Sequence, residues 1–149
     1  MRDADGGPGL LVERFDPSTA LESIRTHHVT VISGAPPMWA SWAALPDAAE
    51  DSFATVRLAV SGAARLPNEV VEAIGKRFGL RLEEGYGLTE AAPVVTASVG
   101  PDTPIGSIGT ALPGIELRLV DDEGDDVLEG DAGEIWVKGP NVFAGYWHD

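Results

Sequence analysis

The 149-residue chain has no cysteine and few basic residues. The absence of cysteine excludes disulfide bonds and thiolate metal sites. Only 10 lysine and arginine residues stand against 24 aspartate and glutamate residues, which gives a formal net charge of −14. Binding to nucleic acid or to an anionic membrane needs basic groups that neutralise phosphate, so the composition argues against both kinds of partner.

Long apolar runs are also missing. No stretch approaches the roughly 18 apolar residues of a transmembrane helix. The first nine residues, MRDADGGPG, lack the basic and apolar regions of a signal peptide. We therefore expect a cytoplasmic protein with no transmembrane segment and a flexible N-terminus over residues 1–10. Apolar residues still make up 44% of the chain, enough for a hydrophobic core.

Residues 11–97 alternate between helix and strand patterns. We expect a helix after Asp16-Pro17, a second from about Pro37 to Leu45 and a third within residues 66–79, where Gly79 ends it. Buried strands are expected at Val29–Ile32, at Val56–Val60 and over residues 80–83. This order predicts an α/β fold with a partial parallel βα layer.

Glycine follows each expected strand, in the loops at residues 33–37, 61–65 and 84–90. The carboxyl ends of parallel strands share one edge of a sheet, and ligands of open α/β sheets bind there. We therefore expect the three loops to converge on one place.

The pattern changes across SVGPDTP, residues 98–104. Short alternating segments at Ile115–Val120 and Glu134–Val137 predict the beginning of a small antiparallel β-subdomain over residues 104–149. Eight carboxylates lie between Asp121 and Glu134. A calcium loop beginning at Asp121 would place Asp126 where a glycine is needed, so a solvated hairpin accounts better for this acidic run.

The stretch EEGYGLTE, residues 83–90, gathers polar groups between apolar segments. Gly85 and Gly87 would let the chain turn tightly around Tyr86, whose ring could stack on a base. Thr89 could donate to a phosphate oxygen and Glu90 could hold a hard cation. The residues alone leave this magnesium–nucleotide site and a simple turn, with Tyr86 in the core, equally open. Similarly, Trp39 and Trp42 are three apart on an expected helix, a spacing typical of core packing.

Two segments carry a family resemblance. RLAVSGAARLPNEVVEAIGKRFGLRLEEGYGLTEAAPVV, followed by GSIGTALPGIELRLVDDEGDDVLEGDAGEIWVKGPNVFAGYW, closely resembles the AMP-forming acyl-CoA synthetases of the adenylate-forming superfamily, especially the fatty-acid–CoA ligases. The resemblance implies a reaction in which a carboxylic acid, most readily a fatty acid, reacts with ATP to give an acyl-adenylate and pyrophosphate. Coenzyme A then takes the acyl group and AMP leaves. The implied cofactors are ATP/AMP, Mg²⁺ and coenzyme A.

The resemblance also implies roles for individual residues. Tyr86 would stack on adenine, while Thr89 and Glu90 would be catalytic, with Thr89 at the α-phosphate and Glu90 binding magnesium. The remaining nucleotide-binding positions would be Ser61, Gly62, Ala63, Gly85 and Gly87. The acyl group would lie near Gly34, Pro36, Met38, Trp39 and Gly109.

Three parts of the family pattern have no match in this sequence. These are the phosphate-gripping loop that ends in lysine, the ribose-binding aspartate, and the C-terminal domain with its catalytic lysine. Lys76 and Lys138 are the only lysines, and neither fits. We therefore expect the chain by itself not to form acyl-adenylate at a useful rate. It would be a fragment of such a ligase; a non-catalytic nucleotide- or acyl-binding module, a split-enzyme subunit with a complementing or self-associating partner, and a remnant without function remain alternatives.

Overall fold

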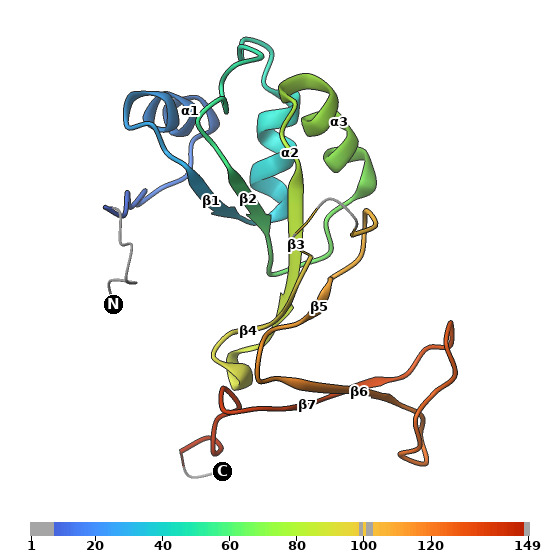
Figure 1. The fold of residues 1–149 in the computed structure, drawn as a ribbon. Coiled ribbons are helices and arrows are strands. Elements are labelled where there is room, and N and C mark those ends of the chain that lie inside the picture. The colour runs from blue at the N-terminus through green and yellow to red at the C-terminus, as the bar shows by residue number, and fades with distance from the viewer. Residues whose placement is uncertain (1–7, 99, 101–102, 148–149) are drawn as a thin grey trace.

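The computed structural model describes residues 8–98, 100 and 103–147 as an α/β fold (Figure 1). The elements in chain order are α1 (Pro17–Thr26), β1 (Val31–Gly34), α2 (Pro36–Ala44), β2 (Leu58–Ser61), α3 (Asn68–Phe78), β3 (Leu82–Gly87), the 3-10 turn η1 (Thr89–Ala91), β4 (Val94–Ala97), β5 (Thr110–Ala111), β6 (Glu116–Val120) and β7 (Glu134–Lys138). The first seven residues of the expected flexible N-terminus and part of the expected crossing at 98–104 lie outside the described residues.

Five strands form one mixed sheet in the order β1-β2-β3-β4-β5. The pairs β1–β2 and β2–β3 are parallel, whereas β3–β4 and β4–β5 are antiparallel. A second sheet consists of the antiparallel pair β6–β7. The predicted α/β fold, with a parallel layer followed by an antiparallel part, is therefore confirmed. Figure 1 shows the three helices around one end of the molecule and the β6–β7 hairpin at the other.

Helices α1 and α3 have the ends that the sequence predicts. The Asp16 carboxylate accepts a hydrogen bond from the Thr19 amide at 2.9 Å, and Pro17 begins α1. Gly79 ends α3 in a left-handed conformation, with φ +64°. Among the described residues, no helix has the length and apolar character needed to cross a membrane.

The core contains a cluster of aromatic rings. Trp39 and Trp42 are 0% and 1% exposed, and their ring centroids lie 5.0 Å apart in an edge-to-face arrangement. Phe53 packs edge-on against Trp42 at 5.4 Å. The Trp39 indole N–H donates to the Gly34 carbonyl oxygen at 3.3 Å, and the Trp42 indole N–H donates to the Pro17 carbonyl oxygen at 3.0 Å. Core packing is therefore confirmed for both tryptophans.

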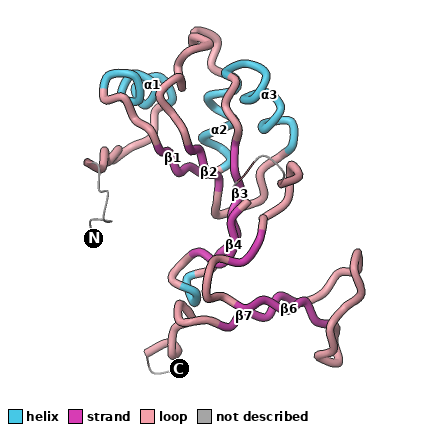
Figure 2. Tube along the Cα trace, viewed as in Figure 1, coloured by secondary structure: helices cyan, strands magenta, loops and turns pink. Residues whose placement is uncertain are grey.

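The predicted tight turn around Tyr86 is wrong. Strand β3 continues through Gly87 and pairs with β4, with a register shift between Tyr86 and Gly87. A Cβ atom at Gly87 would lie 1.8 Å from the Pro93 carbonyl oxygen, so glycine is needed for close contact between backbones. The chain leaves the strand only at η1, the short helical turn beside β4 in Figure 2.

The other strands also differ in extent from their predictions. The strand expected at Val29–Ile32 begins and ends two residues later, and the one expected at Val56–Val60 is β2. Ser33, Gly34 and Ser61 belong to strands because they pair with neighbouring strands. The acidic run forms the exposed connection of the β6–β7 hairpin, where Asp121 Oδ1 accepts from the amides of Glu123 and Asp125.

Candidate functional site

The ends of β1 and β2 lie side by side in the five-stranded sheet, next to the middle of β3. Gly34 of β1 pairs with Ser61 of β2, and Ser61 pairs with Glu84 of β3. The amide of Gly62 donates to the Gly34 carbonyl oxygen at 3.2 Å, which ties the first two loops together. The predicted meeting of these two loops is confirmed, and the third segment passes beside them as a strand.

Ser61 has an unusual environment at this edge. Its side chain is buried, at 1% exposure, and its hydroxyl has no hydrogen-bond partner within the described part of the chain. A buried hydroxyl without a partner costs roughly 1–3 kcal/mol. Two residues later, Ala63 adopts φ +71°, a conformation rare for residues other than glycine. An unpaired polar atom at the end of β2 and a strained backbone two residues beyond it are both typical of ligand sites.

Gly109 lies against the backbone of β4. It has φ +80°, and a Cβ atom there would lie 1.9 Å from the Ala97 carbonyl oxygen. Ala97 in turn pairs with Gly85 of β3. The structure therefore brings Gly109 next to the strand that carries Gly85, where an added Cβ atom would lie 3.0 Å from the Thr96 carbonyl oxygen.

Thr89 and Glu90 lie beyond the end of β3, in turn η1. The Thr89 residue is exposed, and Glu90 is half-buried. The C-terminal segment 141–146, which we call the clasp segment, folds back onto this turn. The Phe143 amide donates to the Glu90 carbonyl oxygen at 2.9 Å, and Asn141 Nδ2 donates to the Ala91 carbonyl oxygen at 2.7 Å.

The clasp segment also contacts the Glu90 side chain. The Tyr146 hydroxyl donates to Glu90 Oε1 at 2.5 Å. This hydrogen bond lowers the pKa of the Glu90 carboxyl and raises the pKa of the Tyr146 phenol. Glu90 is thus held in its charged form. Among the residues that the structure describes, no group of three or more His, Cys, Asp or Glu residues could hold a metal by itself.

Three of the predicted acyl-binding residues, Pro36, Met38 and Trp39, differ in how far their side chains are buried. Pro36 is buried and Trp39 is fully enclosed in the core, so the Trp39 ring has no free face in this structure. Met38 is half-buried and lines an apolar groove of about 350 Å³ with Phe15 and Val31. Of the three, only Met38 borders open space.

Comparison with known protein families identifies the family of this chain. Residues 4–147 match the family described as AMP-binding enzyme. The chain belongs to this family.

Several similar proteins are acid–CoA ligases by name. The chain is 37% identical over 142 residues to a long-chain-fatty-acid–CoA ligase of Bacillus subtilis, covering 93% of this chain and 25% of that one. The ATP-bound structure of MatB from Rhodopseudomonas palustris superposes with a TM-score of 0.85 at 33% identity, over 93% of this chain and 27% of that one. An anthranilate CoA ligase in complex with anthranoyl-AMP gives a TM-score of 0.83 at 31% identity, over 89% and 26%. The chain thus spans about a quarter of each relative.

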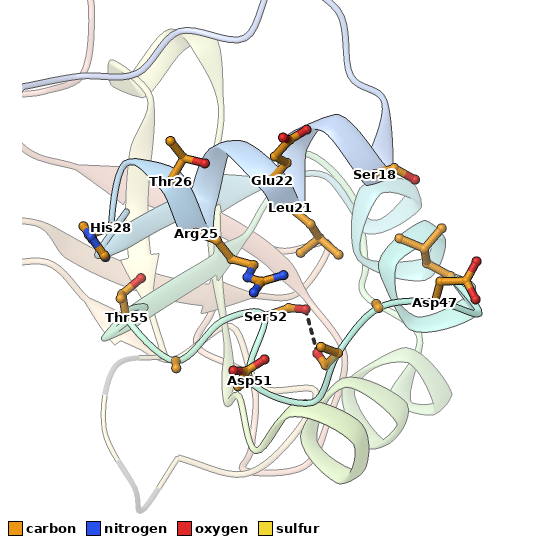
Figure 3. A pocket seen from close by; sticks show the side chains of 14 residues that line it. Ser18, Leu21, Glu22, Arg25, Thr26, His28, Asp47, Asp51, Ser52 and Thr55 are labelled. Carbon is orange, nitrogen blue, oxygen red and sulfur yellow. Dashed lines mark hydrogen bonds between the residues drawn. The ribbon is translucent and has the colours of Figure 1, made fainter.

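A cavity of about 750 Å³ lies elsewhere on this AMP-binding chain, between α1 and residues 45–55 (Figure 3). Arg25 from the helix and Asp51 from the facing loop point toward it, and Ser52 donates its hydroxyl to the Ala49 carbonyl oxygen at 2.6 Å. None of the predicted site residues lines this cavity. It therefore does not form part of the candidate site.

Sequence reasoning did not identify Asn141, Tyr146 or Glu84 as part of the site of this AMP-binding chain. Asn141 and Tyr146 are 50 and 56 residues from their partners on η1. Glu84 is 8% exposed and accepts from the Leu66 amide at 3.3 Å. No local pattern signals such distant pairs. The one local signal for Tyr146 is the triplet GYW, residues 145–147, which ends the second segment that resembles the acyl-CoA synthetases.

Proposed function

We propose that this chain is the nucleotide-holding part of an ATP-dependent, AMP-forming acid–CoA ligase. The observation that carries the proposal is the row Gly34–Ser61–Glu84, which places the ends of β1 and β2 beside β3, where the buried Ser61 hydroxyl has no partner among the described residues. A ligand at this edge would supply the missing hydrogen bond. Membership of the AMP-binding family makes an adenine nucleotide the natural ligand.

The nucleotide would lie along β2 and β3. Tyr86 is half-buried, so one part of its ring is available to stack on adenine. The loop Ser61–Ala63 would follow the base, with Ser61 as a hydrogen-bonding group. The exposed hydroxyl of Thr89 would donate to the α-phosphate.

Glu90 would hold Mg²⁺. Magnesium is commonly bound through one or two carboxylates together with phosphate oxygens of the substrate, so a single carboxylate fits this ion. Glu90 is charged and accepts only one side-chain hydrogen bond, at Oε1, from the described residues. When bound, the ion would neutralise phosphate charge and so favour departure of pyrophosphate.

The proposed reaction belongs to the whole ligase. The acid carboxylate would attack the α-phosphorus of ATP, pyrophosphate would leave, and the thiol of coenzyme A would then displace AMP from the acyl-adenylate. We propose a fatty acid as the substrate, because the relative in Bacillus subtilis is a long-chain-fatty-acid–CoA ligase. Gly34, Pro36, Met38 and Gly109 would border the acyl group, with Trp39 supporting them from the core.

The chain by itself should not complete this reaction. Transfer of the nucleotidyl group depends on fixed cations and donors, and neither Lys76 nor Lys138 lies in a phosphate-gripping loop. Loss of one such donor costs roughly 100-fold in rate or more. We therefore expect no ATP-dependent pyrophosphate release from the pure chain with fatty or aryl acids.

Calorimetric titration with magnesium–ATP tests the proposal. We expect saturable binding that weakens when magnesium is removed, and no release of pyrophosphate in the same samples. Absence of binding would remove the nucleotide-holding role. Rapid pyrophosphate release would instead show that the chain is a complete catalyst.

A complementing polypeptide is a second proposal, favoured by the exposed edge of the sheet. β1 is the outermost parallel strand, and its Val31 is 44% exposed. An uncovered strand edge can pair with another chain. Co-purification with a polypeptide that carries the missing phosphate loop, and restoration of pyrophosphate release by that polypeptide, would support this proposal; a chain that neither binds such a polypeptide nor gains activity from it would count against the proposal.

A further inference from the structure

The clasp segment is arranged around one functional side chain. We propose that Tyr146 is a positioning residue, which holds the Glu90 carboxylate in place for a magnesium–nucleotide. The inference rests on the proposed function, because Glu90 acquires its role from the nucleotide. It adds a residue from the far end of the described chain to that site.

The backbone of turn η1 is fixed at two adjacent residues. The Phe143 amide donates to the carbonyl oxygen of Glu90 at 2.9 Å. Asn141 Nδ2 donates to the carbonyl oxygen of Ala91 at 2.7 Å. These bonds fix the direction from which the Glu90 side chain leaves the backbone.

Tyr146 then fixes the end of that side chain. Its hydroxyl donates to Glu90 Oε1 at 2.5 Å, and its ring packs edge-on against Phe143 with centroids 4.8 Å apart. A free glutamate side chain would lose rotamer freedom on binding a cation, and this hydrogen bond removes that freedom in advance. Tyr146 is 54% exposed, so the pair lies at the surface, where a ligand can reach it.

The position of the Tyr146 hydroxyl allows it to support cation binding by Glu90 without blocking the carboxylate. Tyr146 donates to Oε1, and no side chain among the described residues donates to Oε2. A neutral phenol donor also leaves the negative charge of the carboxylate in place. One oxygen is therefore used for positioning, and the other has no side-chain donor with which a cation would compete.

Binding measurements on Y146F and E90Q test the role in the site. We expect Y146F to weaken magnesium–ATP binding roughly 3- to 10-fold, because the carboxylate must then be ordered by the ligand. We expect no further loss when Y146F is added to E90Q. The matched control is W136F, which removes another aromatic donor to an exposed carboxylate, the 2.8 Å bond from Trp136 to Glu134. W136F should bind as the wild-type chain does.

Amide hydrogen exchange at Phe143 tests the contact without a nucleotide. Y146F should speed exchange several-fold, whereas E90Q should leave it nearly unchanged, because a glutamine oxygen still accepts from the phenol. Unchanged exchange in Y146F would overturn the inference, as would equal or tighter magnesium–ATP binding by Y146F. A wild-type chain that binds no magnesium–ATP, with exchange still dependent on Tyr146, would refute the proposed function and leave Tyr146 as a structural contact.

Discussion

Gly87 allows β3 and β4 to approach more closely than a side chain would permit. A Cβ atom at this position would lie 1.8 Å from the Pro93 carbonyl oxygen. We therefore expect Gly87→Ala to destabilise the fold by about 3 kcal/mol or to prevent folding. Gly62→Ala is the matched control, because no atom lies within 4 Å of its added Cβ. Urea denaturation should show a large loss for the first variant only, and equal stability of both would contradict the observed strand contact.

Ser61 is the opposite case, because its side chain lowers the stability of the ligand-free protein. Because its buried hydroxyl has no partner among the described residues, Ser61→Ala should raise the free energy of unfolding by about 1 kcal/mol. Ser52→Ala should lower it by about 1 kcal/mol, because the equally buried Ser52 hydroxyl donates to Ala49. Chemical denaturation of both variants is the measurement. A loss of stability in Ser61→Ala would mean that the hydroxyl is already satisfied in the free protein.

At the scale of elements, the start of α1 should depend on pH. The Thr19 amide bonded to the Asp16 carboxylate lowers the pKa of that carboxyl in the folded state. The contribution of the cap is therefore complete above the unfolded pKa of about 3.9, and it is lost as pH falls through the lower folded value. Thermal melts of the wild-type chain, D16A and D16N between pH 7 and pH 3 test this.

The wild-type advantage over D16A should shrink below about pH 4, whereas D16N, which keeps an uncharged acceptor, should show no such change relative to D16A. A wild-type advantage that stays constant to pH 3 would contradict a charged cap at Asp16.

Elements defined by neighbouring residues could be predicted from the sequence. Asp16-Pro17 and Gly79 set helix ends through contacts within four residues. Strand limits depended on partners elsewhere in the chain, and so Gly34 and Ser61 were expected in loops. Gly85 and Gly87 were interpreted as turn residues, but their lack of a side chain serves strand contact instead.

For the candidate site, too, the sequence predicted the residues within short motifs but not their long-range contacts. Glu90 was proposed as a cation ligand from the residues of its motif, whereas resemblance to a family assigned the nucleotide-binding role of Ser61. The contact of Glu90 with Tyr146 joins residues 56 apart, which no local pattern records. Long-range contacts of this kind require the structure.

At the scale of the whole molecule, much apolar surface is uncovered. Leu11, Leu128 and Trp147 are 88%, 77% and 89% exposed, and the β6–β7 sheet has only two strands. Two-stranded sheets are marginally stable without a packing partner. We expect a weakly stable monomer that self-associates. Sedimentation velocity over a range of concentrations should detect this, and a monomer at all concentrations with a sharp, reversible thermal transition would contradict it.

Binding of a non-hydrolysable acyl-adenylate analogue tests most directly whether this chain is the nucleotide-holding part of an acid–CoA ligase. Calorimetry should show saturable 1:1 binding to the wild-type chain. Tyr86→Ala should weaken it roughly 10-fold, since stacking of a base on an aromatic ring contributes about 1–3 kcal/mol. Absence of binding to a folded wild-type chain, or equal binding by Tyr86→Ala, would contradict the account.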